Sequence, residues 1–318
     1  MIFGAEGYGC DEDTATKLIR RYLDAGGNVI DTADTYRGSE RICGRALQGL
    51  RDQVVVSTKF GMPVGAGPNE RGAGRVRIRA ACESSLRRLG TDRIDLYWLH
   101  IDDLDTPLEE TISALHDLVR AGKVLYLGIS NLRAYRVMKA LNMCDLLGGP
   151  RFIAYQGDYN LMTRGLEREH FPLLAEENLG FLSWSPLAAG MLTGKIRADD
   201  DTEPTRLNQR SIAVDTLHKN DHGFAVAALV TKLAGRIGCT PAQLALAWQR
   251  SRPVASVILG ARTLAQLDDN LASIDIDVPR DVLEELDLAT AVPPEYPGAF
   301  IATADRWLQR NMTGAVHA

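Results

Sequence analysis

Four ionisable side chains at the ends of three short apolar runs could do chemistry together. Asp31, Lys59 and His100 each end a run that is apolar enough to be a buried strand, and Tyr36 follows Asp31 closely. Burying a carboxylate or a phenol is costly unless each group finds a partner. We therefore expect these side chains to pair with one another.

Proton transfer is the reaction that such a group favours. A tyrosine is a weak acid with an ordinary pKa of about 10, and a neighbouring ammonium favours the phenolate. Asp31 would keep Lys59 charged and oriented, so that Tyr36 could exchange a proton at working pH. His100 could hydrogen-bond a carbonyl oxygen. Because the sequence has neither metal-ligand spacing nor a nucleophile–base pattern, we expect proton transfer to an oxygen, with a hydride-carrying cofactor as electron source.

Each of these residues also has an ordinary structural interpretation when it is taken alone. Asp31 could cap a strand, and His100 could be a hydrogen-bonded core histidine. The functional interpretation is favoured because the groups stand at equivalent ends of three strands. Asp34 is interpreted as a hydrogen-bond acceptor that stabilises a turn, and the basic run 75–79 as a solvated helix face.

Strand-like and helical patterns alternate seven times along the chain. Two capping boxes, Thr106 with Glu109 and Thr240 with Gln243, mark helix starts. The expected strands are 28–32, 53–59, 94–100, 124–130, 152–156, 180–184 and 255–259. The expected helices are 11–25, 39–50, 75–90, 106–122, 132–143, 166–177, 222–237, one beginning at 240, 263–272 and 279–290.

This alternation predicts a parallel sheet with helices outside it. The strands are nearly continuous apolar runs, as expected when both faces are buried. No G-x-G-x-x-G follows a strand, so a doubly wound dinucleotide fold is disfavoured. We predict a single α/β domain over residues 1–318, a (β/α)8 TIM barrel with a tail at about 291–318. Active groups of such barrels lie at the carboxyl ends of the strands.

Composition narrows the possible functions. The net charge of −5 gives no basic surface for nucleic acid or membranes. No run of 18 apolar residues and no secretory signal are seen, so neither a membrane span nor export is expected. The five cysteines are scattered, which makes a disulfide framework or zinc site unexpected and a reducing cytoplasm the default.

Several short motifs together resemble the aldo-keto reductase superfamily over residues 4–297. The variant at 190–195 and the pair Tyr296-Pro297 are similar to the aryl-alcohol-dehydrogenase-like branch, which is also similar to bacterial sugar ketoreductases and potassium-channel beta subunits. The motifs are residues 31–36, Ser39, Glu40, Gly44, 58–60, 95–100, 128–131, Gln156, 183–187 and 260–262.

The resemblance implies a role for each matching residue. Tyr36 would be the general acid in reduction and the base in oxidation, Lys59 and Asp31 would tune it, and His100 would orient the carbonyl. Ser130, Asn131 and Gln156 would hold the nicotinamide carboxamide, and Trp184 would stack on the ring. The pyrophosphate would contact Ser185, Leu187, Gly190, Leu192 and Lys195; the adenosine phosphate would contact Gly260, Arg262, Gln266, Asp269 and Asn270. The cation at Arg262 favours NADP(H) over NAD(H).

The resemblance also implies a small-molecule carbonyl or alcohol as substrate, with a monomer or a homo-oligomer both open. Specificity is expected from residues 61–74, 101–106, 186–220 and 293–307. Candidate substrate-lining residues are Phe60, Trp98, Tyr159, Phe300 and Trp307. A nicotinamide-sensing regulatory subunit and a keto-sugar reductase are the alternative functions.

The family pattern places a further strand before Phe3, so we expect most of the first barrel strand to be absent. A barrel without one strand has two unpaired edges. We hypothesise that a chain supplying this strand would be more stable and more active.

Overall fold

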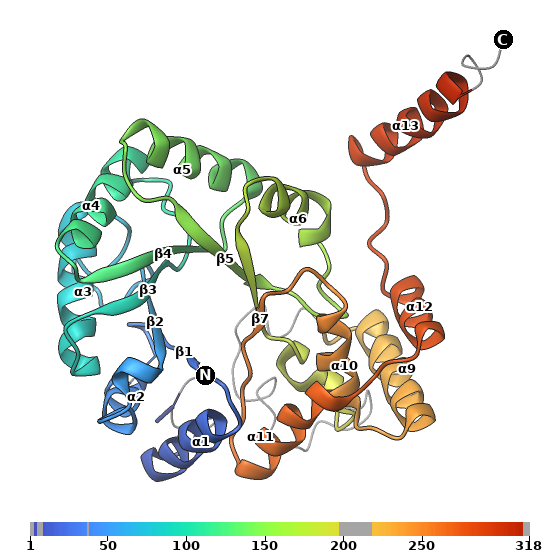
Figure 1. Ribbon diagram of the computed structural model, residues 1–318, viewed down its shortest axis with the longest axis horizontal. Coiled ribbons are helices and arrows are strands. Elements are labelled where there is room, and N and C mark those ends of the chain that lie inside the picture. The colour runs from blue at the N-terminus through green and yellow to red at the C-terminus, as the bar shows by residue number, and fades with distance from the viewer. Residues whose placement is uncertain (1–2, 5–8, 37, 197–217, 314–318) are drawn as a thin grey trace.

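Seven parallel strands form one curled sheet with helices on its outer side, as Figure 1 shows for this computed structural model. The structure describes residues 3–4, 9–36, 38–196 and 218–313. The order of the strands in the sheet is their order in the sequence, from β1 to β7. The described residues thus confirm the prediction of a parallel α/β barrel, and they form seven strands of it, in keeping with the expected missing strand.

The strands match the predicted runs closely; α1 precedes them, α2 to α10 lie between them and α11 to α13 follow them. The strands are β1 (Val29–Asp31), β2 (Val55–Phe60), β3 (Ile94–Leu99), β4 (Val124–Ser130), β5 (Phe152–Asp158), β6 (Gly180–Trp184) and β7 (Ser256–Val257). The α-helices are α1 (Glu12–Asp24), α2 (Ser39–Ala46), α3 (Arg75–Leu89), α4 (Leu108–Arg120), α5 (Ala134–Leu146), α6 (Leu166–Glu176), α9 (Asp221–Ile237), α10 (Pro241–Arg250), α11 (Leu264–Leu271), α12 (Arg280–Ala289) and α13 (Gly298–Thr313). Three 3-10 turns are η1 (Arg51–Gln53), η2 (Ala188–Thr193) and η3 (Ala272–Asp275).

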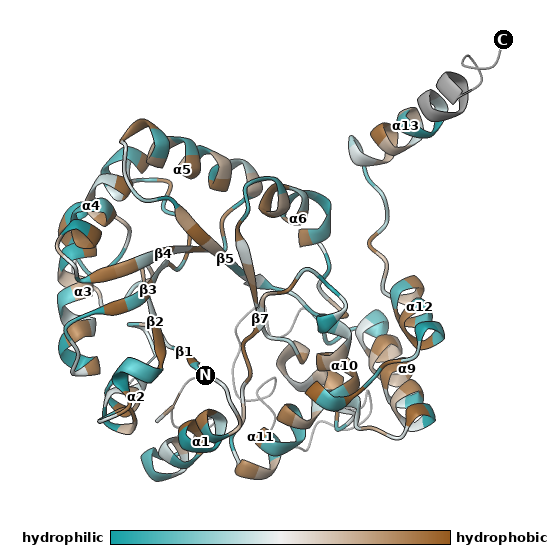
Figure 2. Cartoon of the chain, viewed as in Figure 1, coloured by the Kyte–Doolittle hydropathy of each residue, from teal (hydrophilic) through white to brown (hydrophobic). Residues whose placement is uncertain are grey.

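The core has two parts because the strands alternate their side chains between the two faces of the sheet. The larger part fills the space between the strands and the helices. Brown stretches on the strands in Figure 2 mark their hydrophobic residues. The smaller part lies inside the curl and consists of Leu96, Trp98, Ala154 and Leu182. The Trp98 ring fits there because Gly128 has no Cβ; a Cβ at that position would lie 2.2 Å from the ring.

The curl is open between β1 and β7. Within the described residues β1 pairs only with β2, and β7 pairs only with β6. Side chains of both edge strands and of α1 and α11 line a groove there, among them Leu18, Ile19, Ile30, Ile258 and Leu267. The lining is mainly apolar, which is the environment that a buried barrel strand requires.

Three local predictions need correction or completion. Thr106 does not cap α4: the helix begins at Leu108 without a side-chain cap, and the Thr106 hydroxyl donates to Asp103 instead. The capping box of Thr240 is confirmed. The expected tail contains helix α13, which extends away from the barrel in Figure 1. The expected loop 186–220 contains η2, and its residues 197–217 lie outside the described part of the chain.

No single helix among the described residues is long and apolar enough to cross a membrane. Helices α9 and α10 pass that test of length and composition only as a pair bent by 91°.

Candidate active site

The structure brings Asp31, Tyr36, Lys59 and His100 together at the carboxyl ends of β1, β2 and β3. The Lys59 ammonium forms an ion pair with the Asp31 carboxylate and donates to the carbonyl oxygen of Thr32 at 2.8 Å. The same ammonium lies 5.1 Å from the centre of the Tyr36 ring. The Tyr36 and His100 rings meet edge to face with their centres 6.0 Å apart. Lys59 therefore connects the carboxylate to the phenol.

Burial and pairing act in opposite directions on the Asp31–Lys59 pair. Burial alone would raise the pKa of Asp31, but the Lys59 charge outweighs it and the pKa is lowered. Burial alone would lower the pKa of Lys59, but Asp31 and Tyr36 outweigh it and the pKa is raised. Both groups are therefore ionised at neutral pH, and the ammonium lies beside the phenol in its charged form.

His100 is a neutral imidazole at neutral pH. Burial, with the nearby Lys59 charge, lowers the pKa of His100 to about 3. Its Nδ1 atom is buried and has no hydrogen-bond partner within the described part of the protein. A neutral imidazole has one N–H to donate and one nitrogen to accept, so His100 can bind a polar oxygen without adding a charge.

Hydrogen bonds that the sequence did not suggest also hold the Asp31 carboxylate. The Ser57 hydroxyl donates to it at 2.6 Å, and the Gln156 amide donates across the curl at 3.2 Å. Ser57 and Lys59 lie two residues apart on β2 and so share the inner face. That spacing could have identified Ser57. The contact of Gln156, in contrast, joins residues 125 positions apart.

Asp34 has a partner that corrects the expectation for residues 75–79. Arg77 of this run is buried, and its guanidinium forms an ion pair with Asp34. Burial raises the pKa of Asp34 to about 6, although Arg77 opposes this shift. The Asp34 amide also donates to the Lys59 carbonyl oxygen at 3.2 Å. Asp34 thus ties the loop that carries Tyr36 to α3 and β2, which agrees with a turn-stabilising role.

Ser130, Asn131 and Trp184 lie close together beside this cluster. The Asn131 amide donates to the His100 carbonyl oxygen and to the Ser130 hydroxyl, both at 2.9 Å. Its oxygen accepts from the Trp184 indole at 3.3 Å. Asn131 has a φ of 57°, a left-handed conformation that asparagine tolerates better than most residues. These residues form a polar rim with one aromatic face.

The turn after β6 has an unusual backbone. Ser185, Ala188 and Ala189 have φ values of 55°, 47° and 55°, and Gly190 has 105°. A non-glycine residue in this region costs about 1–3 kcal/mol and persists where its surroundings hold it. Leu187 is half-buried, Leu192 is fully buried and Lys195 is exposed.

Residues expected near the adenosine phosphate lie around the start of α11. The Arg262 amide donates to the Gln266 side chain at 2.8 Å, and the Asn270 side chain donates to the Gly260 carbonyl oxygen at 3.2 Å. Asp269 is engaged elsewhere, since it accepts from the side chains of Thr240, which caps α10, and of Gln243 on that helix. In the described part of the chain, no group of three or more metal-binding side chains is close enough to hold a metal ion.

Most of the expected substrate-lining residues do not reach the four-residue cluster. Phe60 packs against Tyr97 in the outer core. Tyr159 is buried, donates to Glu167 at 2.6 Å and stacks on Trp248. Phe300 and Trp307 are exposed on α13, which lies away from the barrel in Figure 1. Only Trp98 lies inside the curl, two residues before His100 on β3.

A curled parallel sheet with ionisable groups at its carboxyl edge defines a protein of the α/β-barrel class. The model of the Aldo/keto reductase family matches residues 1–290. The chain therefore belongs to the aldo/keto reductase family of oxidoreductases.

Curated relatives cover most of the chain. A probable voltage-gated potassium channel subunit beta of Oryza sativa subsp. japonica is 35% identical over 305 residues, 90% of this chain and 89% of that protein. Norsolorinic acid reductase of Emericella nidulans is 33% identical over 301 residues, 91% and 75% of the two chains. Aryl-alcohol dehydrogenase [NADP(+)] of Phanerodontia chrysosporium is 31% identical over 296 residues, 87% and 76% of the two chains.

Proposed function

We propose that this protein reduces an aldehyde or ketone to an alcohol with NADP(H), and runs the reverse oxidation in principle, with Tyr36 as the general acid and base. The observation that carries the proposal is the position of the Lys59 ammonium, which is paired with Asp31 and lies 5.1 Å from the centre of the Tyr36 ring. An ammonium at this position stabilises negative charge on the phenol oxygen.

The residues at the carboxyl edge suit a nicotinamide cofactor. Ser130 offers a hydroxyl and Asn131 an amide to a carboxamide, and Trp184 offers an aromatic face beside them. Arg262 is exposed at the start of α11, where its guanidinium could bind a 2′-phosphate in two-pronged fashion. This cation is the reason to favour NADP(H) over NAD(H). When bound, the cofactor supplies the hydride.

The protein's own residues would control the proton. Neutral His100 would donate a hydrogen bond to the carbonyl oxygen and hold it near the Tyr36 hydroxyl. Tyr36 would then give its proton to that oxygen as negative charge develops there. Lys59, kept charged by Asp31, would stabilise the phenolate that remains. The five cysteines of the protein are all free thiols, which agrees with action in a reducing cytoplasm.

Cofactor oxidation across a substrate panel tests this proposal. Absorbance at 340 nm would follow NADPH and NADH with nitrobenzaldehydes, aliphatic ketones and keto-sugars. We expect turnover with NADPH that falls by about 10²–10⁴-fold in Tyr36→Phe, with NADPH affinity retained. Wild-type activity in Tyr36→Phe would refute the assigned role of Tyr36.

A regulatory subunit is the second candidate, favoured by the 35% identity to a protein named as a potassium channel subunit beta. This reading expects cofactor binding without physiological turnover. NADPH binding with no activity on any panel carbonyl would favour it. Selective reduction of keto-sugars would instead favour the sugar reductase reading.

A further inference from the structure

Two buried amide side chains contact the strained turn after β6. Asn160 comes from the loop after β5, and Gln249 comes from α10; both side chains are fully buried. The turn includes Ser185 at φ 55°. A backbone held in this region requires contacts that determine it, and the two amides supply such contacts.

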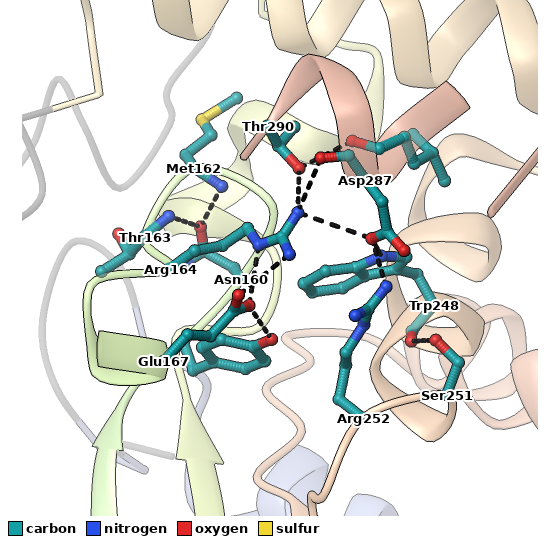
Figure 3. Close-up of polar contacts among 12 residues, drawn as sticks. Asn160, Met162, Thr163, Arg164, Glu167, Trp248, Ser251, Arg252, Asp287 and Thr290 are labelled. Atoms are coloured by element: carbon teal, nitrogen blue, oxygen red, sulfur yellow. Dashed lines mark hydrogen bonds and ion pairs between the residues drawn. The ribbon is translucent and has the colours of Figure 1, made fainter. Parts of the chain in front are cut away.

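Asn160 uses both ends of its amide to join its own loop to the turn. Its oxygen accepts from the backbone amides of Met162 and Thr163 at 2.8 and 3.0 Å, as drawn in Figure 3. Its nitrogen donates to the Ser185 carbonyl oxygen at 3.0 Å and to the Asp158 carboxylate at 3.1 Å. The oxygen thus organises the loop, while the nitrogen holds the turn.

Gln249 ties the same region to α10. Its oxygen accepts from the Ser183 hydroxyl on β6. Its nitrogen donates to the Tyr159 carbonyl oxygen at 3.1 Å and approaches the Pro186 carbonyl oxygen at 3.5 Å. One buried amide therefore contacts residues on both sides of Trp184 and the backbone of the loop that carries Asn160.

An arginine–tryptophan stack anchors the loop and α10 to α12. The Arg164 and Arg252 guanidinium carbons lie 5.4 and 4.9 Å from the centre of the Trp248 ring. Arg164 also bonds to Glu167 and Thr290, as Figure 3 shows. These contacts tie the chain near Asn160 and Gln249 to α12 through Asp287, and so support both amides where they meet the turn.

We propose that Asn160 and Gln249 are positioning residues that hold the turn after β6 in the shape that presents Trp184 and Ser185 to NADP(H). This inference rests on the proposed function, because that function assigns the nicotinamide and pyrophosphate contacts to this turn. Loss of either amide should therefore weaken binding of the nicotinamide and pyrophosphate and leave binding of the adenosine end unchanged.

Asn160→Asp is the sharpest test because it changes one donor group and keeps the shape. The remaining oxygen can still accept from Met162 and Thr163, while the new oxygen faces the Ser185 carbonyl. Gln249→Met is the second variant and removes both polar ends. Thr111→Val is the matched control, since it removes a buried hydrogen bond from α4 to the Ala73 carbonyl oxygen and touches none of the contacts of the turn.

Dissociation constants would be measured by fluorescence titration with NADPH and with adenosine 2′,5′-bisphosphate, which lacks the nicotinamide and the pyrophosphate. Melting temperatures would be recorded alongside. We expect Asn160→Asp to weaken NADPH binding about tenfold, the equivalent of 1.4 kcal/mol, and Gln249→Met to weaken it in the same direction. Binding of the bisphosphate should stay at the wild-type value in both variants, and Thr111→Val should bind both ligands normally.

Other outcomes overturn the inference. It fails if NADPH binding is unchanged in both variants, or if both ligands weaken together. It also fails if both variants do not fold while Thr111→Val does, because the amides are then needed for folding alone. A wild-type protein that binds neither NADPH nor NADH would instead refute the proposed function, which keeps the two failures distinct.

Discussion

Replacing Lys59 with methionine should separate the structural and the chemical roles of the ion pair. The side chain of Lys59 is 1% exposed and that of Asp31 is 7% exposed. Removing one partner of a buried pair costs about 3–5 kcal/mol, because the other charge stays buried. Ser57 and Gln156 still donate to Asp31, so we expect the lower end, about 3 kcal/mol.

The pH dependence of this loss has a defined sign. In the wild type the pKa of Asp31 is lower in the folded protein than in the unfolded chain. The carboxylate therefore stabilises the fold at a pH above its pKa in the unfolded chain, and this stabilisation is lost as the pH falls. Without Lys59, burial should raise the pKa of Asp31 in the folded protein above its pKa in the unfolded chain. The folded variant would then lose stability as the pH rises, because the buried carboxyl group has to ionise. The deficit of Lys59→Met should therefore be smallest near pH 4 and largest near pH 8.

Urea unfolding followed by circular dichroism would measure both effects. The matched control is the double variant Asp31→Leu with Lys59→Met, which removes both charges and should recover most of the lost stability. Carbonyl reduction should remain impaired in both variants, because the ammonium beside Tyr36 is missing in each. A single variant that loses less than about 1 kcal/mol, or a double variant no more stable than the single one, would show that the buried pair is not coupled as described.

Three further predictions concern the imidazole, the phosphate cation and the open edge. Because the pKa of His100 is lowered to about 3, kcat/KM should show no inflection near pH 6.5; one that vanishes in His100→Gln would contradict a neutral imidazole. Stability from this group should be lost as the pH falls from about 6.5, which urea titrations of wild type and His100→Gln would compare. Arg262→Ala should raise KM for NADPH about tenfold, the effect of losing a contact worth 1.4 kcal/mol, with KM for NADH unchanged; equal effects would argue against 2′-phosphate binding. An apolar strand segment fused ahead of Met1 should raise the melting temperature and turnover by filling the groove between β1 and β7, whereas a proline-containing control segment should not; equal melting temperatures and turnover would refute this.

Much of the barrel could be predicted because its signals are local. Apolar runs that stop at Asp31, Lys59 and His100 mark both the strands and their carboxyl ends, and parallel strands bring those ends to one edge. The capping box at Thr240 could be predicted for the same reason, because Thr240 and Gln243 lie only three residues apart. The sequence by itself therefore determined the alternation of strands and helices, and which ionisable groups stand at strand ends.

Only the tertiary structure decided which distant groups meet. Tyr159 looked available to a substrate but is buried against Trp248, and Arg77 looked solvated but is paired with Asp34. No local pattern marks Asn160, because its contact with Ser185 spans 25 residues. A pattern of period two or 3.6 records which face of its own element a side chain occupies. It does not record what the fold places opposite that face, and here that decides both the packing of the core and the support of the site.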